Sequence, residues 1–71
     1  MQRWAYLYVV VDPSSETVRR ENGADAVLES GQLTPSVSDY LAERGEQGWE
    51  LVTAYLTVAN RIMMVLKQPK Q

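Results

Sequence analysis

Residues 3–11 of this 71-residue chain are rich in aromatic and β-branched side chains, which divide with a period of two into two apolar sides. A two-residue period is typical of a β-strand, because successive side chains point to opposite faces of the sheet. One side of this predicted strand carries Trp4, Tyr6, Tyr8 and Val10, and the other carries Ala5, Leu7, Val9 and Val11. Since both sides are apolar, we expect this strand to be central in its sheet or covered on both faces.

Two further strands are predicted over residues 49–58 and 61–68, with a turn at Ala59-Asn60 between them. The first places Val52, Ala54, Leu56 and Val58 on one face and Trp49, Leu51, Thr53, Tyr55 and Thr57 on the other. The second places Ile62, Met64 and Leu66 on one face and Arg61, Met63, Val65 and Lys67 on the other. Pro69 is expected to end it, because proline cannot continue a hydrogen-bonded ladder.

The spacing changes to a helical one over residues 34–47. Thr34 or Ser36 is suited to cap the start of a helix, and Pro35 fits its first turn. Three residues, Val37, Tyr40 and Leu41, follow the i, i+3, i+4 spacing of a buried stripe. Arg44 continues that stripe, with its aliphatic stem over the core and its charge reaching water. Gly48 is the predicted left-handed residue that ends the helix.

Residues 13–33 are a variable loop or hairpin, with a possible strand over 16–21 and a turn at Asn22-Gly23. The segment 24–33 fits either a short strand or a helical turn. The sequence therefore predicts a single small α+β domain in β(β)αββ order. Its antiparallel sheet has three or four strands, with one helix packed on one face.

A chain of this size buries only ~60% of the surface that its unfolded form exposes. Small domains therefore often need a disulfide, a metal or a partner subunit. The chain contains no cysteine and no histidine, which removes disulfides and the commonest metal ligands. We accordingly expect a homo-oligomer or a larger protein partner.

The net charge of −2 and the scattered Lys and Arg residues argue against duplex nucleic acid and anionic membranes as partners. The longest apolar run, residues 5–11, is far shorter than the ~20 residues that span a bilayer. A cytoplasmic protein is the expectation, and the absence of cysteine agrees with that compartment.

Catalytic chemistry has few candidates in this chain. The candidate carboxylate pairs are those of Glu43, Glu46 and Glu50 and those of Asp25 and Glu29. The first set spans the predicted helix end, where a solvated surface is the expected role. The serines have no histidine to activate them. The glycines form no phosphate-binding loop, and no loop has the spacing of a carboxylate metal site. We therefore predict a protein that is not an enzyme and that needs no metal or cofactor.

The predicted faces are asymmetric. Each of the three strands has an aliphatic side, and Trp4, Tyr6 and Tyr8 together with Trp49 and Tyr55 form an aromatic side. One helix covers one face, so we expect it on the aliphatic side. The aromatic side then stays open unless residues 13–33 or another chain cover it. The candidate interface or ligand residues are Trp4, Tyr6, Tyr8, Tyr55 and Met63. Alternatively, both tryptophans belong to the core.

These residues predict a non-catalytic interaction module that self-associates or docks on a larger protein, because Trp and Tyr are favoured at interface cores. The alternative is a small-ligand or nucleotide binder that uses the same face. Stacking of single-stranded nucleic acid on these aromatics is a lesser alternative, because no basic groove accompanies them.

Leu41, Gly45 and the run Gly48-Trp49-Glu50-Leu51-Val52 resemble the L-x-x-x-G-x-x-G-W-E-L-V signature of the DUF4177 family of small bacterial and phage proteins. The start Trp4-Ala5-Tyr6 is similar to the aromatic first strand of that family. The resemblance implies an α+β fold with a hairpin after the helix, and it implies no assigned activity. Its residues have a structural interpretation: Gly45 and Gly48 end the helix, while Trp49 and Leu51 anchor the turn. Arg44 and Gln68 depart from the family pattern.

Overall fold

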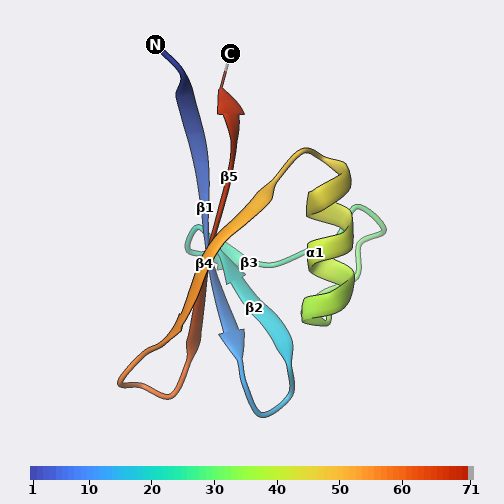
Figure 1. Ribbon diagram of the computed structural model, residues 1–71. Helices are drawn as coiled ribbons and strands as arrows, with labels where there is room; N and C mark the ends of the chain where they lie inside the picture. The colour runs from blue at the N-terminus through green and yellow to red at the C-terminus, as the bar shows by residue number, and fades with distance from the viewer. Residues whose placement is uncertain (71) are drawn as a thin grey trace.

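The computed structural model describes residues 1–70, which form one antiparallel sheet and a helix (Figure 1). The elements in chain order are β1 (Arg3–Asp12), β2 (Thr17–Glu21), β3 (Ala24–Asp25), α1 (Val37–Glu46), β4 (Glu50–Leu56) and β5 (Ile62–Lys70). Across the sheet the order is β3-β2-β1-β5-β4, and each neighbouring pair is antiparallel.

The α+β class is confirmed, but the sheet has five strands where the sequence predicts three or four. Residues 13–33 supply the difference, because they contain both β2 and β3. Asn22 and Gly23 form the turn between these strands, with φ angles of 50° and 83°. The segment 24–33 has a two-residue strand, which is too short to show a period in the sequence.

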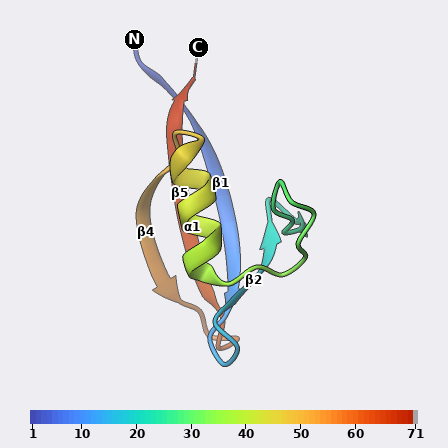
Figure 2. The same ribbon diagram turned by 90° about the vertical axis from the view of Figure 1, so that its right-hand side faces the viewer.

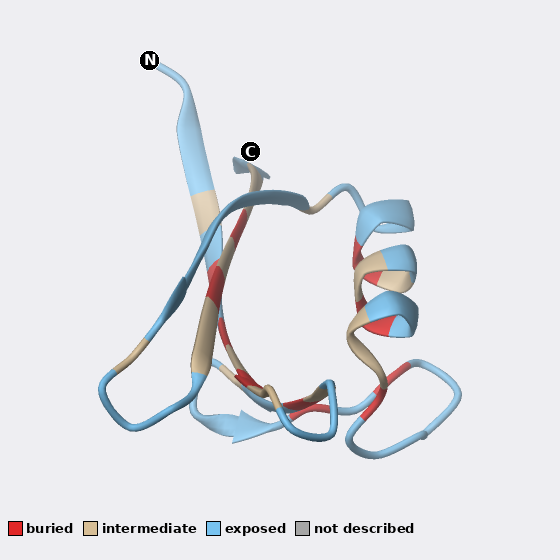
Figure 3. Ribbon diagram, turned by 60° about the horizontal axis from the view of Figure 1, so that its bottom comes forward, coloured by how far each residue is buried: buried red, intermediate tan, exposed pale blue. Residues whose placement is uncertain are grey.

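Strand β1 is central, as predicted, and lies between β2 and β5. Its register with β5 places Leu7 opposite Leu66, Val9 opposite Met64 and Val11 opposite Ile62. These positions face α1 and build the core, which is visible as the buried segments of Figure 3. The buried apolar residues are Leu7, Val9, Val11, Val18, Ala26, Leu28, Tyr40, Met64 and Leu66.

The helix begins at its N-cap Ser36, whose Oγ accepts a hydrogen bond of 3.1 Å from the Asp39 amide. Of the two predicted caps, the structure therefore selects Ser36. Pro35 lies before the cap and outside the first turn, contrary to the prediction. Its carbonyl accepts a 2.8 Å hydrogen bond from the Val18 amide, so the residue that precedes the cap serves to tie the loop to β2.

The end of α1 is a Schellman motif centred on Gly48, as the sequence predicts. Gly48 has φ +92°. Its amide donates to the Gly45 carbonyl at 3.0 Å, and the Trp49 amide donates to the Arg44 carbonyl at 2.9 Å. These two bonds satisfy carbonyls that a helix end leaves without partners. Gly45 contributes its carbonyl from within the helix, so both glycines take part in the termination.

Helix α1 packs beside β2 and leaves β4 apart (Figures 1 and 2). All seven residues of β4 are exposed, and Figure 3 shows this strand exposed along its length. One ten-residue helix is too narrow to cover five strands, so it covers only part of one face of the sheet.

Two features of the last hairpin differ from the prediction. A bulge between Leu51 and Thr53 breaks the two-residue period of β4, so that Leu51 lies opposite Leu66 on the helix side while Tyr55 lies opposite Met63. Strand β5 continues through Pro69, which lies opposite Trp4. Strand β4 pairs with β5 no further than Lys67. Proline is tolerated on such an open edge because no ladder bond is required there.

Candidate interaction surface

The sheet face opposite α1 gathers aromatic side chains from β1 and β4, which lie on either side of β5. Across β1, β5 and β4, one row consists of Val10, Met63 and Tyr55. The next row consists of Tyr8 and Val65, and beyond it Tyr6 lies opposite Lys67 and Trp4 opposite Pro69. We call this surface the aromatic face and define it by Trp4, Tyr6, Tyr8, Val10, Tyr55, Met63, Val65 and Lys67.

The aromatic face is open to solvent. Its four aromatic side chains are exposed by 38% (Trp4), 45% (Tyr6), 55% (Tyr8) and 53% (Tyr55). The Lys67 ammonium nitrogen lies 4.1 Å from the centroid of the Trp4 ring, a cation–π contact that holds the indole against β5. With 150–250 Å² on each aromatic side chain, these four expose about 400 Å², which is already the size of the largest apolar patch on a typical monomer.

The structure brings together the five candidate residues Trp4, Tyr6, Tyr8, Met63 and Tyr55 on this face. Trp49 does not join them: it packs against the core on the helix side, because the β4 bulge reverses the alternation before Thr53. The two tryptophans thus divide, with Trp49 at the core and Trp4 on the open face. Val10, Val65 and Lys67 complete the face. The sequence indicated them, because Val10 lies two residues from Tyr8, and Val65 and Lys67 follow Met63 at the same two-residue spacing.

The residues of the G-x-x-G-W-E-L-V segment have mixed positions. Leu41 and Trp49 pack against the core, and Gly48 ends the helix. Leu51 and Val52 are exposed by nearly half. The turn is therefore anchored by Trp49, at the position after the helix where an apolar contact usually accompanies a Schellman motif. Leu51 does not share in that anchoring.

A polar cluster of Glu21, Tyr40 and Arg44 lies between α1 and β2. The Glu21 Oε1 atom accepts hydrogen bonds from the Tyr40 hydroxyl at 2.7 Å and from Arg44 Nε at 2.8 Å. Arg44 Nη2 donates to Glu21 Oε2 at 3.1 Å, so the ion pair is bidentate. The guanidinium also lies 4.9 Å from the centroid of the Tyr40 ring. These contacts join the helix to the end of β2.

Arg44 is buried, so the prediction that its charge reaches water is wrong. The guanidinium stays inside because it has partners on every side: Arg44 Nη1 donates to Glu43 and Gln47, and Nη2 also donates to the Val27 carbonyl. Nothing local to the helix indicates Glu21 as the partner, since 23 residues separate the two in sequence. Sequence reasoning missed this cluster. The position of Arg44 on an apolar helical stripe could have indicated a buried ion pair.

The cluster shifts the pKa values of its members. Burial alone would raise the pKa of the Glu21 carboxyl, but hydrogen bonds from Arg44 and Tyr40 outweigh burial and lower it from 4.5. Burial, together with the Glu21 carboxylate, raises the pKa of the Tyr40 phenol. The hydrogen bond to Glu21 raises the pKa of Arg44. Separately, hydrogen bonds from Ser14 and Arg19 lower the pKa of the half-buried Asp12 to about 2.

These lowered carboxyl pKa values predict acid sensitivity. A carboxyl whose pKa is lower in the folded state stabilises the fold above its unfolded pKa, and that contribution is lost as the pH falls through the folded value. For Glu21 the loss begins below 4.5. We expect the urea midpoint of the wild type to fall between pH 5 and pH 2. The Glu21→Gln variant should show a shallower fall over the same range, and equal slopes for the two proteins would contradict this assignment.

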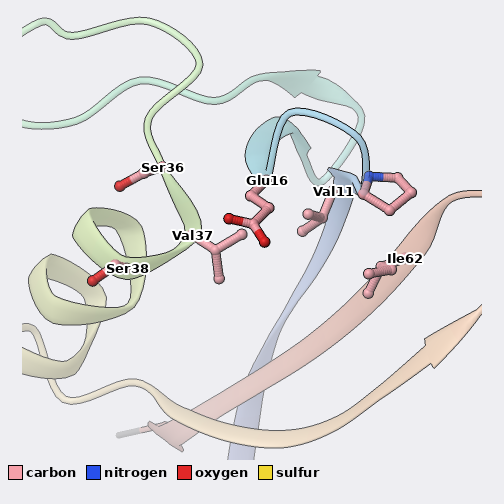
Figure 4. A pocket seen from close by; sticks show the side chains of 7 residues that line it. Val11, Glu16, Ser36, Val37, Ser38 and Ile62 are labelled. Carbon is pink, nitrogen blue, oxygen red and sulfur yellow. The ribbon is translucent and has the colours of Figure 1, made fainter.

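A pocket of about 480 Å³ lies between the start of α1 and the adjacent ends of the sheet strands (Figure 4). Its lining consists of Val11, Pro13, Glu16, Ser36, Val37, Ser38 and Ile62. Glu16 is the one titratable residue among these seven, so the two serine hydroxyls face no basic nitrogen. This lining is better suited to apolar contact with a bound group than to catalysis.

Within residues 1–70, no group of three or more acidic side chains is arranged to hold a metal ion. In the same part of the chain, no helix has the length and apolar character needed to cross a membrane.

Comparison of the chain with known protein families, with curated proteins and with solved structures finds no match. The resemblance to the DUF4177 family therefore stays a prediction from the residues that carry it.

Proposed function

We propose that this protein is a non-catalytic interaction module that associates with a second copy of itself through the aromatic face. The observation that carries the proposal is the exposure of four aromatic side chains on one side of the sheet, opposite the helix. Aromatic residues are enriched at the cores of protein interfaces, where they combine a large contact area with few rotatable bonds.

The titratable groups support a non-catalytic role. The groups on the helix side whose pKa values are shifted, Glu21, Tyr40 and Arg44, form hydrogen bonds with one another. Such ion-pair networks perturb pKa values for structural reasons as well as catalytic ones. None of these three residues lines the apolar pocket beside the start of α1.

The small size of the core also supports the proposal that a second chain covers this face. Nine buried apolar residues hold a five-stranded sheet together, and one side of that sheet has no cover within residues 1–70. Covering it with the same face of a second copy would place apolar rings against apolar rings. A twofold arrangement of this kind is the commonest form of association between identical chains.

The test is the solution mass by light scattering over a range of concentrations, for the wild type and for Tyr6→Glu/Tyr8→Glu. We expect the wild type to associate and the double variant to weaken that association by at least about a hundredfold, since each 1.4 kcal/mol is a factor of ten. The physical reason is the cost of burying carboxylates without partners. Far-UV circular dichroism should stay unchanged, because both tyrosines point away from the core.

The matched control is Gln32→Glu/Leu33→Glu, which adds the same charge at exposed positions outside the aromatic face. It should associate like the wild type. A wild-type chain that stays monomeric at high concentration would contradict the proposal, as would a Tyr6→Glu/Tyr8→Glu variant with unchanged mass.

A further inference from the structure

The outer edge of β4 is a second surface that has no partner within residues 1–70. The sheet order places β4 at one end, next to β5 alone. All seven of its residues are exposed, and Leu56 is exposed by 65%. Figure 2 shows the strand standing apart from α1. An edge strand presents a row of backbone donors and acceptors to any strand that can pair with it.

This edge has few of the devices that prevent pairing. Proteins protect edge strands with proline, lysine, inward charges or short length. Strand β4 reads Glu-Leu-Val-Thr-Ala-Tyr-Leu, with neither proline nor lysine and with its one charge at the first residue. The bulge between Leu51 and Thr53 interrupts the start of the strand, but the residues after it continue in regular register up to the hairpin.

The direction of the free backbone groups follows from one hydrogen bond. The Thr57 amide donates to the Arg61 carbonyl at 2.7 Å, so the backbone of Thr57 faces β5. Backbone groups alternate in direction along an antiparallel strand. The backbone of Tyr55 therefore also faces β5, and the N–H and C=O groups of Ala54 and Leu56 face outward.

The residues along this edge are nearly symmetric about Tyr55. The five residues from Thr53 to Thr57 read Thr-Ala-Tyr-Leu-Thr. If two copies pair antiparallel about Tyr55, each threonine lies opposite a threonine and Tyr55 lies opposite its equivalent. Ala54 then exchanges backbone hydrogen bonds with Leu56 of the other copy. Threonine pairs and aromatic pairs are favourable cross-strand neighbours.

We infer that β4 pairs with β4 of a second copy of this chain, antiparallel and centred on Tyr55, to form a continuous ten-stranded sheet. The charges at the two ends of the hairpin support pairing with a second copy. Glu50 starts the strand and Arg61 follows the hairpin turn, and within residues 1–70 neither forms an ion pair. Antiparallel pairing brings Glu50 of each copy toward the hairpin end of the other, which carries Arg61.

The exposed apolar area beside β4 also supports edge pairing. A standard interface buries about 800 Å² on each partner, which is about twice what the four exposed aromatic side chains supply. Leu51, Val52, Leu56 and Val58 on and beside β4 are exposed by 44% to 110%, and pairing of β4 would cover part of this aliphatic surface.

This inference rests on the proposed function, because both require a second copy, but it uses a different surface. Edge pairing leaves the aromatic face open and doubles its width. Packing of two such double-width faces then gives a closed tetramer in which each copy uses both surfaces. Loss of one surface should leave a dimer held by the other.

The test uses disulfide cross-linking, since the chain contains no cysteine of its own. Opposite residues whose backbones face away from the partner strand have Cα atoms about 4.5 Å apart, which suits a disulfide. Under mild oxidation we expect Tyr55→Cys to form a covalent dimer. Thr57→Cys alone should not, because its two copies are roughly 13 Å apart along the strands. A mixture of Thr53→Cys and Thr57→Cys chains should cross-link to each other.

A second pair of variants tests the backbone bonds. Ala54→Pro removes an outward N–H and leaves the bonds to β5 in place, whereas Ala54→Val keeps that N–H. Combined with Tyr55→Cys, the proline should reduce cross-linking at least tenfold, and the valine should not. If circular dichroism shows that Ala54→Pro is unfolded, the cross-linking at positions 53, 55 and 57 still tests edge pairing.

The outcomes separate the two proposals. Cross-linking of Tyr55→Cys in the Tyr6→Glu/Tyr8→Glu background supports edge pairing as an independent contact. An associated wild type whose Tyr55→Cys variant does not cross-link, or cross-links no better than Thr57→Cys, overturns edge pairing and leaves the aromatic-face proposal standing. A monomeric wild type overturns the self-association on which both depend.

Discussion

Replacing Arg44 with alanine is expected to destabilise the folded chain by up to about 3–5 kcal/mol, because the change leaves the half-buried Glu21 carboxylate without its ion-pair partner. Glu21 would keep the Tyr40 hydroxyl as a donor but lose both bonds from the guanidinium. A chain of 71 residues has about 4–10 kcal/mol of stability in total, so this single change should bring it close to unfolding. Urea denaturation at one fixed protein concentration measures the loss.

Arg20 provides the matched control for that experiment. It forms a surface ion pair of 3.3 Å with Asp25, and both side chains are more than half exposed. Arg20→Ala should cost less than about 1 kcal/mol, because exposed ion pairs are screened by water. Similar losses for the two arginines would show that the buried cluster has no special weight.

A double variant separates charge burial from packing. In Glu21→Gln/Arg44→Met no charge of the cluster stays buried, and the glutamine can still accept from the Tyr40 hydroxyl. Buried ion pairs can often be replaced by neutral side chains at little cost. We therefore expect the double variant to be more stable than Arg44→Ala.

Replacing Leu66 with alanine is the second change with a large expected effect. Leu66 is 1% exposed and lies on β5 between Leu7 of β1 and Leu51 of β4. Truncating a buried leucine removes its transfer free energy and leaves a cavity, which together cost about 2–5 kcal/mol. Thermal unfolding at fixed concentration should show a clearly lower midpoint for Leu66→Ala than for the wild type.

Leu33→Ala is the corresponding control, since that leucine is 63% exposed in the segment between β3 and α1. Surface substitutions of this kind usually change stability by no more than about 0.5 kcal/mol. If Leu33→Ala were as damaging as Leu66→Ala, the core would lie elsewhere than between β1, β5 and α1.

Together the two variants describe how a chain with so small a core holds its helix. The apolar core on β1 and β5 supplies burial, and the cluster of Glu21, Tyr40 and Arg44 joins the helix to β2 at the edge of that core. Within residues 1–70, no comparable cluster joins α1 to β4. The strand that the helix does not cover is also the one whose edge has no partner within residues 1–70.

Local patterns along the sequence determined most of the secondary structure. The two-residue period identifies β1 and β5, because each strand keeps its register over most of its length. Gly48 marks the helix end, since the Schellman motif requires a left-handed residue there. The alternation of Tyr6 and Tyr8 with Leu7 and Val9 also divides the aromatic face from the core, because side chains of one strand must alternate between its two faces.

Tertiary structure decided the features that depend on contacts between distant segments. The bulge of β4 reverses the faces of Leu51 and Trp49, because its register is set by β5 and not by its own sequence. The charge of Arg44 stays buried because Glu21, on a strand 23 residues earlier, meets it. The position of α1 over β2 likewise leaves β4 open. The sequence period shows which side of an element is apolar. The element that packs against that side is determined only by the tertiary structure.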